Sequence, residues 1–468
     1  MNTVNTTYTS TPLEPPLAPA GLERLGHRLQ AAEGYRFGGR VRRCSGLTVA
    51  AAGMRRLVGI GDSCLIERRQ QASGRGEAPF DARCAMPAEV VGFAGEEVLL
   101  IPYEETTGVG FGARVAIERR LDSVSPGPDW RGRILDPFAA PLDDGPPPAP
   151  GPRAYSLRGK PVPAHRRSLV GERLSLGVRA LDLFTPCCRG QRMGIFAGSG
   201  VGKSTLLSMM ARDSDADVLV VGLIGERGRE LNEFLYRTLS PEARARCVVV
   251  VATSDMPAMM RRRAAYLAMT VAEALRDQGL GVLCLLDSVT RFAMALREIH
   301  LAAGEVPTSR GYPPSVFAEL PQLLERAGPG EGEAAITGLF TVLVEGDDNN
   351  EPIADAVRGI LDGHIVLDRA IAEGGRFPAV DVLRSVSRTA PGCYAPTERQ
   401  AVGKARRLLR AHADMAELIR LGAYKRGADP LVDEAIAARP GLEELLRQEV
   451  DERAPADDSF AKLAAAVG

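Results

Sequence analysis

The sequence predicts a multidomain chain with a small N-terminal β-barrel, a central α/β domain with a mostly parallel sheet, and a helical C-terminal domain. Short β-type runs separated by Gly or Asp turns fill residues 36–121, and even spacing of this kind is typical of a small barrel. Apolar strands alternate with helical stretches from about 165 to 395, which is the pattern of a parallel sheet. From residue 396 onward the patterns are helical.

The boundaries between these parts are placed where the composition changes. Residues 1–20 are rich in Thr and Pro, which is typical of a disordered lead, and residues 21–32 place Leu22, Leu25 and Leu29 on one helical face. Prolines crowd residues 136–163, where they block regular helix and sheet. The predicted units are a flexible N-terminal segment (1–35), the β-barrel (36–135), a proline-rich linker (136–164), the α/β domain (165–395) and the helical domain (396–468).

The individual elements follow from local patterns. Barrel strands are predicted at residues 47–49, 63–66, 88–91, 97–101 and 114–117. Core strands of the α/β domain are predicted at residues 193–196, 217–224, 247–252, 282–286 and 338–343. In the helical domain, Thr397 is the predicted N-cap of a first helix, with Gln400 three residues later completing a capping box. A second helix is predicted from Asp429 and a third near Pro440.

Composition and charge argue against several classes of function. The formal net charge is −1, so no overall basic field favours a nucleic-acid partner or an acidic lipid surface. The eight cysteines contain no C-x-x-C pair and do not cluster with the histidines, which argues against a Cys/His metal site and favours free thiols in a reducing cytosol. We expect neither a signal peptide nor a membrane span, so another protein would have to hold the chain at a membrane.

A glycine-rich loop after a short apolar strand is the most informative functional motif. Residues 195–205 read Ile-Phe-Ala-Gly-Ser-Gly-Val-Gly-Lys-Ser-Thr, and a helix-forming run follows. Glycines let backbone N–H groups turn toward phosphate oxygens, Lys203 reaches the β- and γ-phosphates, and the Ser204 hydroxyl holds Mg²⁺. A plain flexible loop would leave the Lys-Ser pair unexplained. The predicted nucleotide-binding loop comprises Gly198, Ser199, Gly200, Val201, Gly202, Lys203, Ser204 and Thr205.

Two further strand ends carry carboxylates. Glu226 follows the apolar run 217–224, at the strand end that faces the ligand crevice of such sheets, where it can polarise a water against the γ-phosphate. The alternative is a surface glutamate paired with Arg227 or Arg229. Asp287 ends the apolar run 282–286, which makes a Walker B strand whose carboxylate holds Mg²⁺, often through water.

Residues 377–388 carry a family resemblance. They read Phe-Pro-Ala-Val-Asp-Val-Leu-Arg-Ser-Val-Ser-Arg, and Pro-Ala-Val-Asp followed by Ser-x-Ser resembles the signature of the α/β subunits of rotary ATP synthases. Gly-Glu-Arg-x-Arg-Glu at 225–230 is similar to the catalytic glutamate segment of that superfamily. Further stretches resemble the flagellar protein-export ATPases more than a synthase subunit, namely residues 177–182, 310–316, 344–355 and 360–367. The resemblance covers roughly residues 36–450, and Ala139–Ala140 stand where relatives usually carry Gly-Arg.

The resemblance implies a RecA-like P-loop domain and hexameric rings with ATP bound at subunit interfaces. It gives catalytic roles to Lys203, Glu226, Arg227 and Arg388, with Arg388 as a finger that reaches the γ-phosphate of a neighbouring subunit. Without the family argument, Arg388 reads as a structural ion pair. Phe377 matches an aromatic residue that stacks on adenine, or is an ordinary core residue. Arg291 matches a phosphate-proximal arginine, and Ser204 with Asp287 would place Mg²⁺.

The function that the resemblance implies is ATP hydrolysis that energises export of flagellar proteins. The implied location is the cytoplasm, with peripheral recruitment to the inner membrane at the flagellar base. Implied partners are a regulatory stator-like protein at the N-terminal segment, a central coiled-coil stalk protein at the C-terminal domain, and the export gate, chaperones and cargo. The basic residues after Thr397 are a candidate stalk contact or an ordinary solvated helix face.

Three alternatives share parts of this pattern. A virulence-type (injectisome) secretion ATPase has nearly every motif. The catalytic subunit of an ion-coupled ATP synthase is a second alternative, although this chain holds a complete catalytic set in one polypeptide. A RecA-type ring translocase on RNA is a third, which the near-neutral charge and the lack of an aromatic-basic run argue against.

Overall fold

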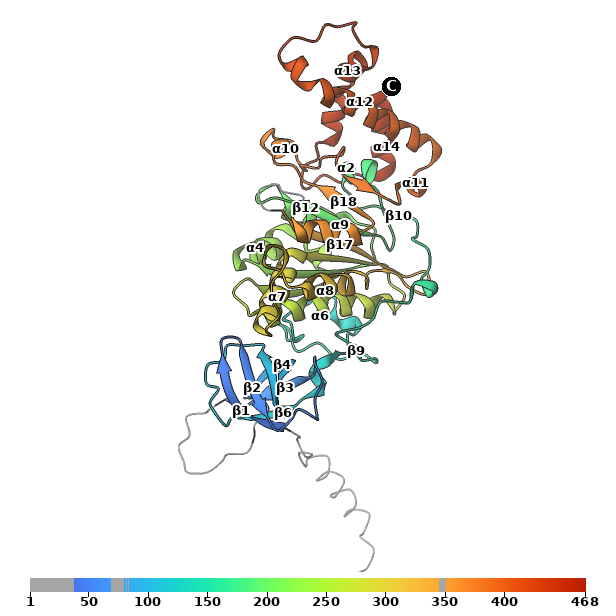
Figure 1. Cartoon of the computed structure of the whole chain (residues 1–468). Coiled ribbons are helices and arrows are strands. Elements are labelled where there is room, and N and C mark those ends of the chain that lie inside the picture. Colours follow the sequence, from blue (N-terminus) through green and yellow to red (C-terminus); the bar gives the residue numbers. More distant parts are fainter. Residues whose placement is uncertain (1–37, 69–79, 81, 83, 345–350) are drawn as a thin grey trace, which may run out of the picture.

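The computed structural model describes residues 38–68, 80, 82, 84–344 and 351–468. A β-barrel lies at one end, an α/β sheet domain in the middle, and a group of helices at the other end (Figure 1). The predicted fold class is confirmed. The helix predicted within 21–32 and part of the 344–355 motif lie outside the described residues, and the exact domain boundaries stay a prediction. No helix in the described ranges is both long and apolar enough to cross a membrane.

The barrel is closed and antiparallel, in the order β1-β2-β5-β4-β3-β6. Its strands are β1 (Gly38–Ser45), β2 (Thr48–Ala52), β3 (Ser63–Ile66), β4 (Met86–Ala94), β5 (Glu97–Pro102) and β6 (Arg114–Ile117). The five predicted runs each overlap one of these strands. Strand β1 was missed because it has a single buried position, Val41, among arginines, so it lacks apolar alternation.

The central sheet has the order β19-β18-β12-β17-β15-β13-β14-β8 and is parallel except at β19 and at β16, which pairs with β17. Its strands are β8 (Ile134–Leu135), β12 (Arg192–Ala197), β13 (Val218–Glu226), β14 (Cys247–Thr253), β15 (Val282–Asp287), β16 (Gly328–Pro329), β17 (Ala335–Leu343), β18 (Gly363–Val366) and β19 (Val386–Ser387). All five predicted core strands are present. The short strands β8 and β18 were not predicted, because each is too brief to show a period.

Side chains alternate between the two faces of this sheet, and helices cover both. In β13, Leu219 and Val221 pack on one face and Val218 and Val220 on the other. The first face is covered by α2 (Arg179–Phe184) and α3 (Lys203–Asp213). The C-terminal helices α12 (Pro396–Arg420), α13 (Pro430–Leu446) and α14 (Ala456–Val467) lie beyond the sheet (Figure 1) and join the same core where α13 and α14 pack against α2. The second is covered by α6 (Ala258–Arg276), α7 (Val289–Ala302), α8 (Pro314–Leu324) and α9 (Pro352–Ile360). Short helices are α4 (Gly228–Glu233), α5 (Pro241–Ala245), α10 (Arg369–Glu373) and α11 (Ala390–Cys393).

Two predictions about the helical domain are wrong in detail. Helix α12 begins at Pro396 with Ala395 as N-cap, and the Glu398 carboxylate accepts a hydrogen bond of 2.8 Å from the Ala395 N–H, so the box predicted at Thr397 and Gln400 does not form. Helix α13 continues through Pro440 because Leu442 and its neighbours stay packed in the core, and the third helix begins only at Ala456. The predicted start after Asp429 is confirmed.

The expectation of free thiols is wrong for one pair. Cys188 and Cys393, 205 residues apart, are joined by a disulfide between β11 (Cys187–Cys188) and α11. Cys44, Cys64, Cys187, Cys247 and Cys284 are free thiols. Sequence spacing could not reveal this pair, because the segment after β19 lies beside β11 only in the folded chain.

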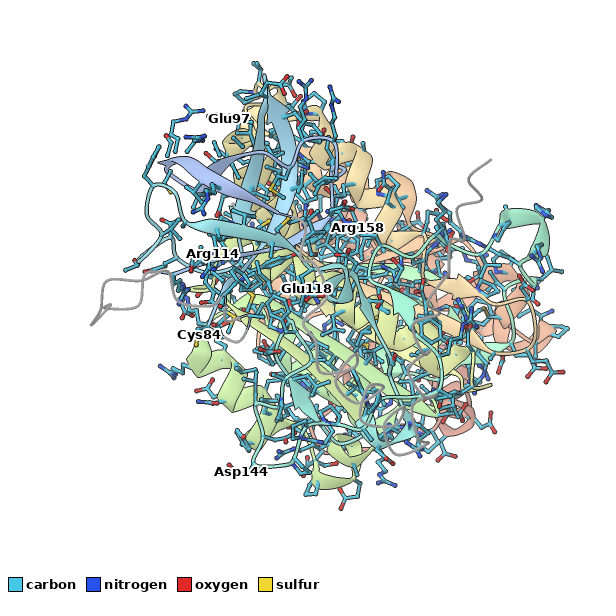
Figure 2. All side chains as sticks on the ribbon, turned by 90° about the horizontal axis from the view of Figure 1, so that it is seen from below. Cys84, Glu97, Arg114, Glu118, Asp144 and Arg158 are labelled. Atoms are coloured by element: carbon cyan, nitrogen blue, oxygen red, sulfur yellow. A yellow bond between two sulfur atoms is a disulfide. The ribbon has the colours of Figure 1, made fainter. Side chains whose placement is uncertain are left out.

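Buried ion pairs fasten the barrel and the linker to the sheet domain. Glu89 of the barrel accepts hydrogen bonds from Arg262 of α6, at 2.5 Å, and from Arg158 of the linker. Figure 2, which looks from the barrel end, labels Arg158 beside the barrel. Arg326, whose side chain is fully buried, donates to both Glu273 oxygens at 2.9 and 2.6 Å and to the Leu157 carbonyl at 2.7 Å.

Removing the Arg326 guanidinium should strongly destabilise the sheet domain. Arg326→Ala leaves the Glu273 carboxylate buried without its cation, and breaking such a pair costs about 3–5 kcal/mol of unfolding free energy. Urea unfolding followed by intrinsic fluorescence measures the loss. The control is Arg166→Ala, whose pair with Glu331 at 3.0 Å is solvent-exposed and should contribute less than about 1 kcal/mol. Equal losses for the two variants would contradict the assignment.

Candidate active site

The glycine-rich loop joins β12 to α3 at the carboxyl end of the sheet. Gly200 and Gly202 have φ values of 78° and 90°, in the left-handed region that glycine adopts at no steric cost. Helix α3 begins directly at Lys203, so its first N–H groups and the positive end of its dipole face the loop. The strand, the turn and the helix N-terminus together form a cradle suited to an anion such as a phosphate.

Lys203 lies between the two predicted carboxylates. Its Nζ is 2.5 Å from Asp287 Oδ1 and 3.2 Å from Glu226 Oε1. These residues stand at the ends of parallel strands, β15 for Asp287 and β13 for Glu226, so the parallel order of the sheet brings them to one edge. The alternative pairing of Glu226 with a neighbouring arginine does not occur, because Arg227 approaches Glu230 at 3.7 Å and Arg229 pairs with Glu233 at 3.1 Å.

Burial and mutual charge set the protonation of this cluster. Burial alone lowers the pKa of Lys203, but the carboxylates of Asp287 and Glu226 outweigh it and hold that pKa above its ordinary value. Burial raises the pKa of Asp287, against the opposing effect of Lys203. Burial also raises the pKa of Glu226, with Lys203 again opposing it and nearby Glu230 adding to the rise. Glu226 thus holds a proton more readily than an exposed glutamate.

Thr341 is a residue of this cluster that sequence reasoning missed. It lies in β17, between the loop strand β12 and the Walker B strand β15, and its hydroxyl donates a 2.6 Å hydrogen bond to Asp287 Oδ1. The side chain is fully buried. A polar threonine within the apolar run 338–343 was the available signal, because a buried hydroxyl needs a partner.

The donor set fits a magnesium ion. The Ser204 hydroxyl belongs to the exposed first turn of α3, and Asp287 presents a carboxylate at the neighbouring strand end. Mg²⁺ prefers oxygen ligands and is usually held by one or two protein groups together with waters and substrate phosphates. Two oxygen donors beside a phosphate cradle match that preference.

Phe377 and Arg291 lie on either side of the loop region. Phe377 is 47% exposed, and its ring carbons lie 3.6 and 3.7 Å from the position that a Cβ on Gly202 would occupy. An exposed aromatic ring against the start of α3 is available to stack on a base. Arg291, in the first turn of α7, has its stem against Gly225 and its Nη1 3.7 Å from the Met294 sulfur, while its buried Nε has no hydrogen-bond partner.

Arg227, predicted as catalytic, points away from this pairing. Its side chain is 78% exposed and lies 3.7 Å from Glu230. The chain turns from β13 into α4 at this residue, which is the N-cap of the helix. Its position one residue after Glu226 places it at the mouth of the site, while Lys203 makes the direct contacts with Glu226 and Asp287.

Arg388 lies at the opposite end of the same strands. Its backbone N–H donates to the Asp362 carbonyl at 3.0 Å, and Asp362 in turn is bound to Arg192, the first residue of β12. The cradle begins after Ala197, five residues further along β12, which is about 16 Å at the rise of a strand. Arg388 is exposed and cannot span that distance, so within one chain it is not part of the site that Lys203 defines.

Comparisons with known proteins place the chain. The nucleotide-binding domain of the ATP synthase alpha/beta family matches residues 177–387, and the T3SS EscN ATPase C-terminal domain matches residues 394–465. The flagellum-specific ATP synthase of Caulobacter vibrioides is 54% identical over 431 residues, which cover 91% of this chain and 94% of that protein. The flagellum-specific ATP synthase of Bacillus subtilis is 46% identical over 440 residues, covering 94% and 97%.

Solved structures agree with these sequence matches. The assembled ATPase EscN from the type III secretion system of enteropathogenic E. coli superimposes with a TM-score of 0.84 at 38% identity, covering 92% of this chain and all of that one. EscN in complex with its central stalk EscO gives a TM-score of 0.82 at the same identity and coverage. The fold, the phosphate cradle and these matches define a nucleotide-binding ATPase of the ATP synthase α/β family. Within it, the chain belongs to the family of flagellum-specific ATP synthases and type III secretion ATPases.

Proposed function

We propose that this chain hydrolyses ATP to energise the export of flagellar proteins through the flagellar type III secretion apparatus. The observation that carries the proposal is the placement of Lys203 within 3.2 Å of both Asp287 and Glu226 at the mouth of a phosphate cradle. A cation for the phosphates, a carboxylate for a metal and a second carboxylate for water are the parts that phosphoryl transfer to water requires. The flagellar relatives, which match over more than nine-tenths of the chain, support the cargo assignment.

We assign each residue of the site a role in ATP hydrolysis from its position. Backbone N–H groups of 198–205 and the Lys203 ammonium bind the phosphates, Ser204 and Asp287 hold the metal, and the Glu226 carboxylate accepts a proton from the attacking water. A Mg²⁺ ion held by Ser204 and Asp287 would supply positive charge against the charge that develops on the phosphate oxygens. Phe377 supports the adenine ring, and Arg291 lies close enough to the Glu226 strand end to help order the site.

We infer that the site is completed by a second copy of the chain. Arg388 is too far from its own cradle, so its proposed role as a finger requires a neighbour, and a head-to-tail contact of this kind closes into a ring, here a hexamer. A central stalk partner is supported by the EscN–EscO complex, and we propose that it is a coiled coil that contacts the C-terminal helices. A regulatory partner at the N-terminal segment, and recruitment from the cytoplasm to the inner membrane at the flagellar base, complete the proposal.

An injectisome ATPase is the second candidate. The SPI-2 type 3 secretion system ATPase of Salmonella typhimurium is 49% identical over 365 residues, which cover 78% of this chain. The Caulobacter flagellar relative is more similar and extends over 91% of the chain, so the flagellar role is favoured.

Replacing Lys203 should abolish both ATP turnover and flagellar export. Lys203→Ala removes the cation that contacts the phosphates, so a strain carrying it in place of the normal gene should secrete no flagellin and should not swim in soft agar. Lys462→Ala, an exposed lysine on α14, is the matched control and should swim normally. Normal motility with loss of another secreted cargo would favour the injectisome alternative, and unaffected secretion of every cargo would refute the role in export.

A further inference from the structure

A buried glutamine holds the segment that carries Arg388. Gln191 is fully buried and lies directly before β12. Its side-chain amide forms hydrogen bonds with the residues on both sides of Arg388. Its Nε2 donates to Ser387 Oγ at 3.0 Å, and its Oε1 accepts from Thr389 Oγ1 at 2.8 Å. The residues immediately before and after Arg388 are therefore fixed by a single side chain.

The same amide also fixes the backbone partner of Arg388. Gln191 Nε2 lies 3.3 Å from the Asp362 carbonyl, the oxygen that accepts the Arg388 N–H at 3.0 Å. The Oε1 atom additionally accepts from the Cys188 N–H at 2.9 Å, which ties the amide to β11. Ser387 and Thr389 hydroxyls lie 3.2 Å apart, so the two sides of the clamp also touch each other. Every polar atom of this amide is engaged at the base of the finger.

We propose that Gln191 is a positioning residue, which holds the backbone at Arg388 so that the arginine side chain is directed toward the neighbouring subunit's nucleotide. The inference rests on the proposed role of Arg388 as a finger acting between subunits. An exposed arginine at a chain turn has many rotamers, and the backbone from which it extends is itself free to move. A displacement of about 1 Å of a catalytic group can cost on the order of 100-fold in rate. A buried amide that is hydrogen-bonded to Ser387, Thr389 and the Asp362 carbonyl, and also to the Cys188 N–H and the Met193 sulfur, removes that freedom from the backbone, leaving only the side chain to adjust.

The clamp has a chemical reason to be glutamine. These contacts need one group that donates on one side and accepts on the other, and a carboxylamide is the neutral side chain that does both. Glutamate would place a buried charge there and would lose the donor to Ser387 and Asp362. Methionine has a similar length and shape and neither polar function, so it tests the hydrogen bonds with little change in volume.

The expected result for Gln191→Met is a fall in kcat of about 100-fold with the KM for ATP within about twofold of the normal chain. The cradle that binds ATP is at the other end of β12, so ATP binding should persist. Thr389→Val, which deletes one contact and is milder on folding, should reduce kcat less. Assembly is checked by size-exclusion chromatography with light scattering, and thermal melts identify any variant that fails to fold. All assays contain a reductant, so that the Cys188–Cys393 pair is in one state throughout.

Mixed assemblies separate an effect on the neighbour from an effect within the subunit. Gln191→Met chains are co-expressed with Lys203→Ala chains under two different tags, and complexes that carry both tags are purified. Lys203→Ala subunits lack a working cradle but carry a normal clamp and finger, so they should complete the sites of adjacent Gln191→Met subunits. In a random equal mixture, a site is complete when its cradle belongs to a Gln191→Met subunit and its finger to a Lys203→Ala subunit, which holds for about a quarter of all sites. Activity should therefore rise to roughly a quarter of the normal turnover.

Two comparisons make the outcome decisive. Arg388→Ala with Lys203→Ala should be rescued in the same way; if it is not, the finger proposal itself fails. If Arg388→Ala is rescued and Gln191→Met is not, only the Gln191 inference is overturned. Gln448→Met is the matched control. Gln448 is another buried amide, which contacts the Gly177 carbonyl at 2.9 Å and the Arg179 N–H at 2.8 Å. Because its loss acts within its own subunit, the activity of this variant should not be rescued by Lys203→Ala subunits.

Discussion

Glu226→Gln should bind ATP normally and hydrolyse it about 10²–10⁴-fold more slowly than the unmodified chain, the usual contribution of a positioned general base. The amide cannot accept the proton of the attacking water, whereas Lys203, the cradle and Asp287 stay in place. Binding is measured with a fluorescent ATP analogue, and turnover is measured by phosphate release. Unchanged turnover would refute the assignment of Glu226 as the base.

The pH dependence gives this prediction a second readout. Burial raises the pKa of Glu226 above the ordinary glutamate value of about 4.3, and the base must be ionised to work. As the pH falls through that raised pKa, kcat/KM should decline, so the acid limb lies above the range of an exposed carboxylate. Glu226→Gln should lose this limb. Glu233→Gln replaces a partly exposed carboxylate seven residues further on, which pairs with Arg229, and this variant should keep both the rate and the limb.

Arg388→Ala should assemble normally and lose about 10³–10⁵-fold in turnover, the contribution of an arginine finger in phosphoryl transfer. The guanidinium is exposed and reaches no nucleotide within its own chain, so its removal should leave monomer stability and the KM for ATP nearly unchanged. ATPase assays across a range of protein concentration measure the effect. The unmodified chain should become more active per subunit as it assembles, and the variant should not.

Arg384→Ala is the matched control for this arginine. It lies four residues earlier in the same segment, is half exposed, and pairs with Asp368 at 3.1 Å within the chain. Its removal should change turnover by less than about threefold, since an exposed pair of this kind contributes little. Equal losses for both arginines would show that the segment tolerates no change. Normal turnover of an assembled Arg388→Ala variant would refute the finger.

Local patterns predicted most of the fold and the nucleotide end of the site. Strands with clear alternation or long apolar runs were found, and the strand ends at Glu226 and Asp287 followed from chain order, because a parallel sheet aligns its carboxyl ends. Thr341 was missed since its role depends on which strand lies between β12 and β15, and strand order across a sheet is not written in any one segment.

Contacts between segments that are distant in the sequence could not be predicted from local patterns. The disulfide between Cys188 and Cys393 and the clamp of Gln191 on Ser387 and Thr389 join segments about 200 residues apart. The start of α12 shows a smaller failure of the same kind: in place of the predicted cap at Thr397 and Gln400, Glu398 accepts a hydrogen bond from the Ala395 N–H and also pairs with Arg173 at 3.1 Å. The contact with Arg173 joins residues 225 positions apart, so no local pattern could reveal it.

The two ends of β12 give the assembly a direction. One end leads into the phosphate cradle, and the other, through Arg192, Asp362 and Gln191, holds Arg388, the proposed finger for the next subunit's nucleotide. If Arg388 acts as proposed, a single strand connects each site to one neighbour and not to the other. In the proposed head-to-tail ring, each site is therefore completed by one particular neighbour, and all pairs of cradle and finger follow one rotational sense.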